Sequence, residues 1–222
     1  MVDVAKDHNG AARSTTGPLL DARPTSSIND GQRHRRDPVA ASAPVAGSRS
    51  ATATRYLLAG IRLALGWIFL WAFLDKLFGL GHSTAAAKSW LNGGSPTAGF
   101  LGKSATGPFT GFYHSIAGST VADALFMAAL LGIGVALILG IGMRIAAGAG
   151  IALMAMMWLA EFPLDKTAAD GKPSGSNNPI TDYHFIYAVT GIVLALTYAG
   201  HTWGLGKWWA SRPLVQKNRW LI

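Results

Sequence analysis

Residues 124–143 of this chain read ALFMAALLGIGVALILGIGM and contain no charged side chain. A bilayer core about 30 Å thick needs roughly 17–25 predominantly apolar helical residues to cross it. An uncharged run of this length is too long for the core of a soluble domain in a chain of 222 residues. The sequence therefore predicts a membrane-spanning helix over about Val121–Met143.

Three further apolar runs predict three further spans. The first is expected over about Tyr56–Phe78, and one charge, Arg62, interrupts its apolar part. The third is expected over Ile145–Phe162 and the fourth over Phe185–Gly200. Each of these two reaches spanning length only with polar residues at its end, namely Glu161 and the pair Tyr183–His184. The predicted fold is all-α, a polytopic membrane four-helix bundle.

Small residues recur every four positions in two of these spans. The second span has Gly132, Ala136 and Gly140, and the fourth has Gly191, Ala195 and Ala199. Small residues one turn apart let helix backbones approach closely in lipid. We expect both stripes to face neighbouring helices.

Residues 1–54 differ in composition from the rest of the chain. They are rich in Ala, Ser, Thr, Pro, Arg and Asp and contain no aromatic residue. Such a segment buries too little apolar surface to offset its ordering entropy, so we expect a disordered tail. It also lacks the apolar stretch of a cleavable secretory signal. The expected organisation is a polar tail (1–54), one transmembrane domain (55–210) and a short basic C-terminal tail (211–222).

The chain is basic, with a net charge of +8. The basic residues flank the predicted spans without the regular aromatic interleaving that reads bases, which argues against a nucleic-acid partner. Arg49 and Arg55 precede the first span, Arg144 lies in the second turn, and further basic residues follow the fourth span. The positive-inside rule then predicts a multi-pass plasma-membrane protein with both termini in the cytoplasm.

Cysteine is absent from the sequence. The chain therefore has no thiolate for a disulfide, an iron–sulfur cluster or a c-type haem. Any electron transfer would need a diffusible redox group or one carried by a partner.

This topology gathers polar residues at the outer membrane face. A quinone headgroup needs hydrogen-bond donors, and its proton-coupled reduction needs a carboxylate or an imidazole. We therefore predict acid–base roles for Asp75, Asp182 and His184. The predicted quinone contacts are Trp71, Lys76, His82, Glu161 and Tyr183. For Asp75 and Lys76, the alternative interpretation is that both are simply charged residues solvated at the membrane interface.

Two other polar features have simpler interpretations. A metal site could use His82, His114 and His184 with Glu161 or Asp182, but no compact pair of histidines supports it, so none is predicted. Arg62 lies about 9 Å inside the first span, at 1.5 Å per residue. The favoured interpretation is a side chain that reaches back to the lipid headgroups, and the alternatives are a buried interhelical pair and a ligand contact.

Four stretches resemble the DoxX/DoxD family of small membrane proteins. They are RLALGWIFL (62–70), LDKL (74–77), NPITDYH (178–184) and AGHTWGLG (199–206). The resemblance covers about residues 55–210 and implies a four-helix membrane bundle. Some members of that family are membrane subunits of thiosulfate:quinone oxidoreductase. The positions that match its motifs include Asp75, Lys76, Asp182 and His184.

Two functional hypotheses follow. The first is a membrane redox subunit that handles quinone at its outer face, with thiosulfate as a candidate electron donor. Its partners would be the bilayer, the quinone pool and a second subunit or another copy of the chain. The alternative is a non-catalytic scaffold or accessory subunit of a respiratory or stress-related complex.

Overall fold

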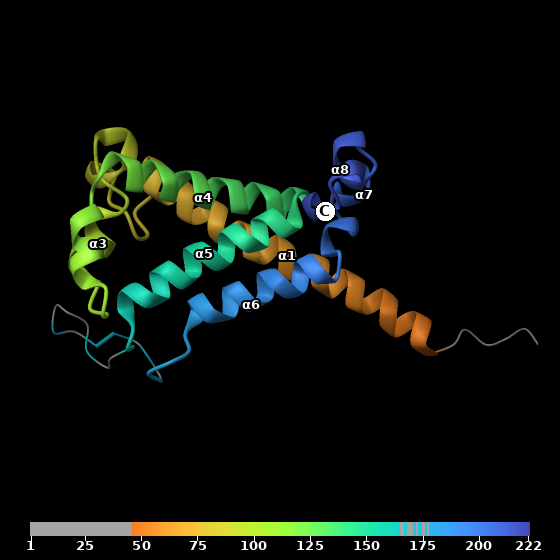
Figure 1. The fold of residues 1–222 in the computed structure, drawn as a ribbon, viewed down its shortest axis with the longest axis horizontal. Coiled ribbons are helices and arrows are strands. Elements are labelled where there is room, and N and C mark those ends of the chain that lie inside the picture. The colour runs from red at the N-terminus through yellow and green to blue at the C-terminus, as the bar shows by residue number, and fades with distance from the viewer. Residues whose placement is uncertain (1–45, 165–166, 168–170, 172, 175, 177) are drawn as a thin grey trace, which may run out of the picture. The chain divides into compact units, whose positions relative to one another are not determined.

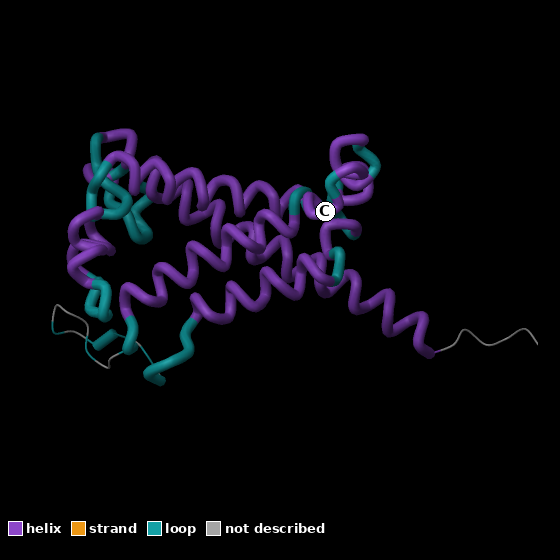
Figure 2. Tube along the Cα trace, viewed as in Figure 1, coloured by secondary structure: helices purple, strands orange, loops and turns teal. Residues whose placement is uncertain are grey.

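The computed structural model describes residues 46–164, 167, 171, 173, 174, 176 and 178–222, which are mostly helical (Figure 1). The four longest helices are α1 (Ala46–Phe78), α4 (Thr120–Leu139), α5 (Met143–Glu161) and α6 (Tyr183–Leu196). Figure 2 shows loops and shorter helices gathered at the two ends of these four. The shorter helices are η1 (Ala86–Lys88), η2 (Trp90–Asn92), α2 (Ala98–Lys103), α3 (Thr110–Ile116), η3 (Ala199–His201), α7 (Gly206–Ala210), α8 (Pro213–Lys217) and η4 (Arg219–Leu221). The described residues form no strand, so the all-α prediction is confirmed for them.

Three of the four long helices have the length and composition to cross a membrane. These are α1 from Arg49 onward, α4 and α5. Helix α6 is apolar but has only 14 residues, about 21 Å at 1.5 Å per residue. It is therefore shorter than the predicted fourth span, which was expected to continue to Gly200.

The early end of α6 has a local cause. The Thr197 hydroxyl donates back to the main-chain oxygen of Val193 at 2.7 Å. Tyr198 then adopts a left-handed conformation with φ of 52°, and the short helix η3 begins after it. A residue with this left-handed backbone conformation does not continue a right-handed α-helix.

The first helix starts earlier than predicted. Residues 46–54 were expected to belong to a disordered tail, but they form the beginning of α1. Extending an existing helix adds one hydrogen bond for each residue ordered, which costs far less than starting a new one. The apolar span thus continues as helix through this alanine- and threonine-containing stretch. The disorder predicted for residues 1–45 lies outside the described residues.

Helix α1 packs along α4, and α5 packs along α6. A tight turn joins α4 to α5, where Gly140 and Gly142 take φ values of 71° and 57°. Helix α4 therefore ends at Leu139, before the predicted Met143. Consecutive long helices run in opposite directions, which brings the start of α1 to the same end as the end of α6 (Figure 1).

The small-residue prediction is correct for α6, whereas on α4 it holds at Gly140, which lies against Gly200, and fails at Gly132. Gly191, Ala195 and Ala199 are buried. On α4, a methyl group added at Gly134 would lie 2.7 Å from the main-chain nitrogen of Leu70, whereas nothing lies within 4 Å at Gly132. The close contact with α1 thus uses Gly134 in place of Gly132.

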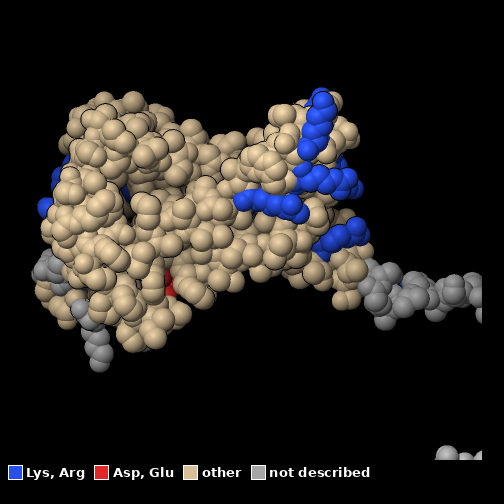
Figure 3. Space-filling view, viewed as in Figure 1, with Lys and Arg blue, Asp and Glu red and all other residues tan. Residues whose placement is uncertain are grey.

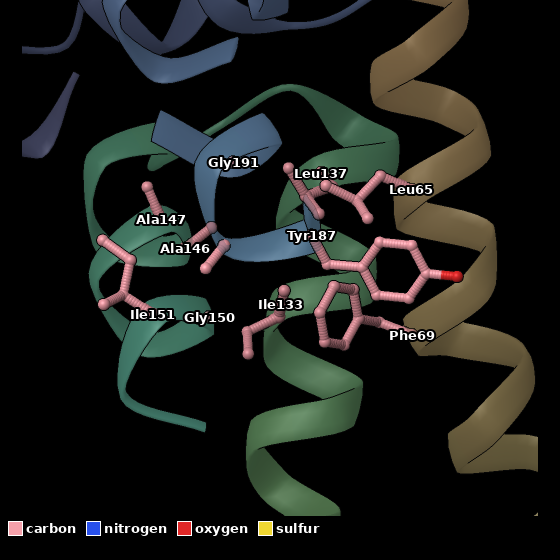
Figure 4. A pocket seen from close by; sticks show the side chains of 11 residues that line it. Leu65, Phe69, Ile133, Leu137, Ala146, Ala147, Gly150, Ile151, Tyr187 and Gly191 are labelled. Carbon is pink, nitrogen blue, oxygen red and sulfur yellow. The ribbon is translucent and has the colours of Figure 1, made fainter. Parts of the chain in front are cut away.

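Apolar side chains from all four long helices fill the centre of the bundle. Figure 4 shows Leu65 and Phe69 of α1 facing Ile133 and Leu137 of α4, with Tyr187 of α6 beside Phe69. The remaining void there is only about 10 Å³. This is about the volume of one water-sized probe, so the centre is a packed core that has no room for a ligand.

Candidate functional site

The structure brings together four of the predicted site residues where α5 ends and α6 begins. Asp182 is the N-cap of α6, and its carboxylate accepts from the main-chain N–H of His184 at 3.0 Å. The other oxygen of Asp182 lies 2.6 Å from Nδ1 of His184. Glu161 is the last residue of α5, and the ring of Tyr183 lies 4.0 Å from the His184 ring. We call Glu161, Asp182 and His184 the acidic–histidine cluster.

Among the described residues, the imidazole of His184 has a hydrogen-bond partner at only one of its two ring nitrogens. Its side chain is fully buried, and its Nε2 has no hydrogen-bond partner among the described residues. A carboxylate at Nδ1 fixes the orientation of the ring and leaves Nε2 for another group. The cluster can therefore hold or transfer a proton at the Nε2 of His184.

The cluster also has the composition of a cation site, which the sequence did not predict. One potential ligand atom from each of its three residues lies within 4.8 Å of the other two. Carboxylate oxygen and imidazole nitrogen are common ligands of divalent metals. Spacing along the sequence could not reveal this group, because Glu161 precedes Asp182 by a whole loop.

The remaining predicted residues form a second group at the end of α1. Asp75 is buried, and its carboxylate accepts from the main-chain N–H groups of His82 and Ser83, each at 3.1 Å. It also accepts from the Ser83 hydroxyl at 2.7 Å. Both oxygens of Asp75 thus accept hydrogen bonds from the turn that follows α1. This indicates that Asp75 fixes the position of the turn.

Lys76, Trp71 and His82 complete this second group. The Trp71 and His82 rings lie edge to face with centroids 5.2 Å apart. The Lys76 ammonium lies 3.4 Å from the Ser83 hydroxyl and 6.0 Å from the centroid of the Phe126 ring on α4. No hydrogen bond or ion pair between described residues joins this group to the acidic–histidine cluster.

A cavity that the sequence did not predict lies between α4, α5 and the helices α2 and α3. Its volume is about 370 Å³, and its lining is almost entirely apolar. None of the predicted site residues lines it, although Lys76 lies over Phe126, which does. We call it the α4–α5 cavity. Its lining residues are Pro96, Thr97, Phe100, Leu101, Tyr113, Ile116, Ala122, Leu125, Phe126, Ala129, Ala149, Ala152, Leu153, Met156 and Met157.

Two polar contacts hold α2 and α3 over this cavity. Asp123 of α4 is buried and accepts from the main-chain N–H and the hydroxyl of Thr97, at 2.9 and 2.6 Å. The Tyr113 hydroxyl donates to the main-chain oxygen of Met156 at 2.8 Å. Burial raises the pKa of Tyr113, so this donor keeps its proton. The sequence could have indicated this contact, because Asp123 lies directly before a long apolar run and a buried acidic group needs a partner.

Arg62 is buried, so the favoured interpretation, that it reaches the headgroups, is wrong. Its guanidinium donates to the main-chain oxygens of Leu137 and Ile138 in the last turn of α4, the latter at 2.8 Å. It also donates to the oxygens of Thr202 and Trp203, at 3.2 and 2.9 Å. The carbonyls at the end of a helix lack partners within the helix, and Arg62 supplies donors to two of them.

Comparisons of the chain with protein-family models, with curated proteins and with solved structures find no match in any of the three. The DoxX/DoxD resemblance therefore remains a prediction from the quoted residues.

Proposed function

We propose that this chain is a four-span membrane subunit that binds quinone in the α4–α5 cavity and exchanges its protons through the acidic–histidine cluster. The α4–α5 cavity carries this proposal. Its volume of about 370 Å³ falls in the range of small-molecule sites, about 300–1,000 Å³. Its apolar lining suits the ring and isoprenoid chain of a lipid-soluble quinone.

The cavity is open on the side that would face lipid. Two of its lining residues, Leu125 and Met156, are 67 % and 49 % exposed. A quinone could then enter from the bilayer without passing through water. The other lining residues include Phe126, whose ring can stack on an aromatic ligand, and Met157, whose flexible side chain can adapt to it.

The route for protons follows one face of α5. Residues four apart on a helix lie on the same face, so Leu153, Met157 and Glu161 form one line. The first two line the cavity, and Glu161 lies about 6 Å further along the axis at 1.5 Å per residue. Glu161 thus links this face of α5 to Asp182 and His184, whose potential ligand atoms lie within 4.8 Å of its own.

The distribution of charge supports cytoplasmic termini. Most of the lysine and arginine atoms visible in Figure 3 lie at the end that carries α7 and α8. Arg55, Arg144 and Lys207 belong to this end, whereas the acidic–histidine cluster lies at the other. By the positive-inside rule the basic end faces the cytoplasm. Helix α6 together with η3 would then form the fourth span.

The resemblance to the DoxX/DoxD family suggests thiosulfate as the electron donor. Two thiosulfate ions would join through a new sulfur–sulfur bond to give tetrathionate and release two electrons. The quinone would take up these electrons with two protons and become the quinol. Because the chain has no cysteine, we place the sulfur chemistry on a partner subunit.

A pair of adjacent alanines on α4 tests the quinone site. Ala129 lines the cavity, whereas Ala128 is exposed on another face. We expect wild-type protein to retain quinone on mild purification, Ala129→Phe to lose most of it, and Ala128→Phe to retain it. Quinone extraction and chromatography measure all three. Equal quinone content in both variants would show that quinone does not bind in this cavity. Wild-type protein without quinone would favour the scaffold hypothesis.

A further inference from the structure

A second cavity lies at the basic end of the helices, away from the α4–α5 cavity. Its volume is about 190 Å³, and its lining is half polar. Arg55 and Leu58 of α1 form one side, and Ala199, His201 and Thr202 with Lys207 of α7 form the other. We call it the Arg55–Lys207 cavity.

The length of α4 indicates at which level of the bilayer this cavity lies. This helix has 20 residues, about 30 Å at 1.5 Å per residue, which equals the thickness of a bilayer core. At the end of α4, the main-chain oxygen of Leu139 accepts from the N–H of Leu205 at 2.7 Å. The segment that forms the cavity thus lies where α4 leaves the hydrocarbon, at the level of the lipid headgroups.

Among the residues that the structure describes, no acidic side chain pairs with the positive charges at this cavity. Every acidic side chain of the described residues lies in the other half of the molecule, at Asp75, Asp123, Glu161 and Asp182. Among the described residues, the Arg55 guanidinium hydrogen-bonds to the Thr52 hydroxyl at 3.5 Å, and Lys207 is exposed and has no side-chain hydrogen bond. An anion in the cavity would therefore face two uncompensated cations.

His201 contributes an imidazole ring to the same lining. Its Nε2 is buried and has no hydrogen-bond partner among the described residues. An imidazole can donate an N–H to an anion whether the ring is neutral or protonated. The lining therefore combines an imidazole ring with the two cations.

The surroundings of the cavity are those of the membrane interface. Trp203 and Trp208 are 62 % and 50 % exposed in the adjoining segment, and such aromatic residues concentrate at headgroup level. Leu58 and Ala199 give the cavity an apolar side. A free phosphate ion would gain nothing from that side, whereas a lipid also has glycerol and acyl carbons to bury.

We infer that the Arg55–Lys207 cavity binds the phosphate of an anionic phospholipid. The phosphate is held between Arg55 and Lys207, and the first acyl carbons lie against Leu58 and Ala199. Basic pockets at a membrane surface bind anionic headgroups in this way. This inference requires that the helices span a bilayer and is independent of quinone binding.

Native mass spectrometry of the full chain in mild detergent, titrated with phosphatidylglycerol, tests the inference. The test variant is Arg55→Gln with Lys207→Gln. The control is Arg49→Gln with Lys217→Gln, which removes the same charge from exposed residues of the same end. We expect the test variant to bind phosphatidylglycerol at least about tenfold more weakly and the control to change by less than about threefold.

Three results would overturn the inference. One is an equal loss in both double variants, which would indicate general surface charge. Another is equal binding of phosphatidylcholine, which carries no net charge. The third is full displacement of phosphatidylglycerol by millimolar inorganic phosphate, which would make this a site for the free ion. Thermal unfolding without added lipid monitors folding, and Lys207→Gln alone serves if the double variant is unstable.

Discussion

The guanidinium of Arg62 on α1 donates to the main-chain oxygen of Ile138 in the last turn of α4 at 2.8 Å. The same side chain bonds the oxygens of Thr202 and Trp203 beyond α6. One buried cation thereby joins three segments that are distant in sequence. Because water does not reach this side chain, the loss of its contacts should cost stability.

We expect Arg62→Met to destabilise the protein by about 3 kcal/mol or more, because it leaves buried carbonyl oxygens without donors. Thermal unfolding in detergent measures the loss. Arg49→Met is the control, since Arg49 is exposed near the start of the same helix. Equal stability of the two variants would mean that Arg62 contributes little.

Two glycines on α4 provide a matched pair for helix packing. A methyl group at Gly134 would lie 2.7 Å from the nitrogen of Leu70, whereas Gly132 faces open space. We expect Gly134→Ala to cost about 1–3 kcal/mol through overpacking and Gly132→Ala to be neutral or slightly stabilising. Thermal unfolding of both variants checks this, and the reverse order would contradict the observed register of α4 against α1.

Asp75→Asn should lower stability by about 1–3 kcal/mol, because an amide NH₂ cannot accept the hydrogen bonds that the carboxylate takes from residues 82 and 83. Proteolysis of the turn after Phe78, together with thermal unfolding, measures the effect. Normal stability combined with a large loss of quinone turnover would instead return Asp75 to the acid–base role predicted from the sequence.

His184→Gln should reduce quinone-dependent turnover by roughly 10²-fold or more, the lower end expected when acid–base help is lost. Glutamine can still bond to Asp182 but takes up no proton near neutral pH, so folding should survive. His114→Ala on α3 is the control, because His114 is exposed. Turnover within about twofold of wild type in folded His184→Gln would favour the scaffold hypothesis.

The proposed topology is testable by labelling single cysteines in this cysteine-free chain. Leu91 is 64 % exposed in η2 between α1 and α4, and Lys217 is exposed at the basic end. We expect an impermeant thiol reagent to label Leu91→Cys from outside intact cells and Lys217→Cys only after lysis. The opposite pattern would invert the orientation of the bundle.

The apolar spans and the basic end were predictable because both depend on composition over short stretches. Bilayer thickness sets the length of a spanning helix, so the runs around α1, α4 and α5 could be recognised without knowing their neighbours. The proximity of Asp182 and His184 was also predictable, because they are only two residues apart in the sequence. The end of α6 at Leu196 was not predictable, because the sequence there remains uncharged while the conformation of Tyr198 ends the helix.

The sequence by itself therefore determined an all-helical chain with apolar spans, a basic end and no thiol chemistry. Only the tertiary structure decided that Arg62 is buried, that Glu161 joins Asp182 and His184, and that a cavity remains between α4 and α5. Each of these depends on which faces of distant helices meet, and helix packing is set by side-chain contacts across the bundle. Hydropathy along one segment carries no information about those contacts.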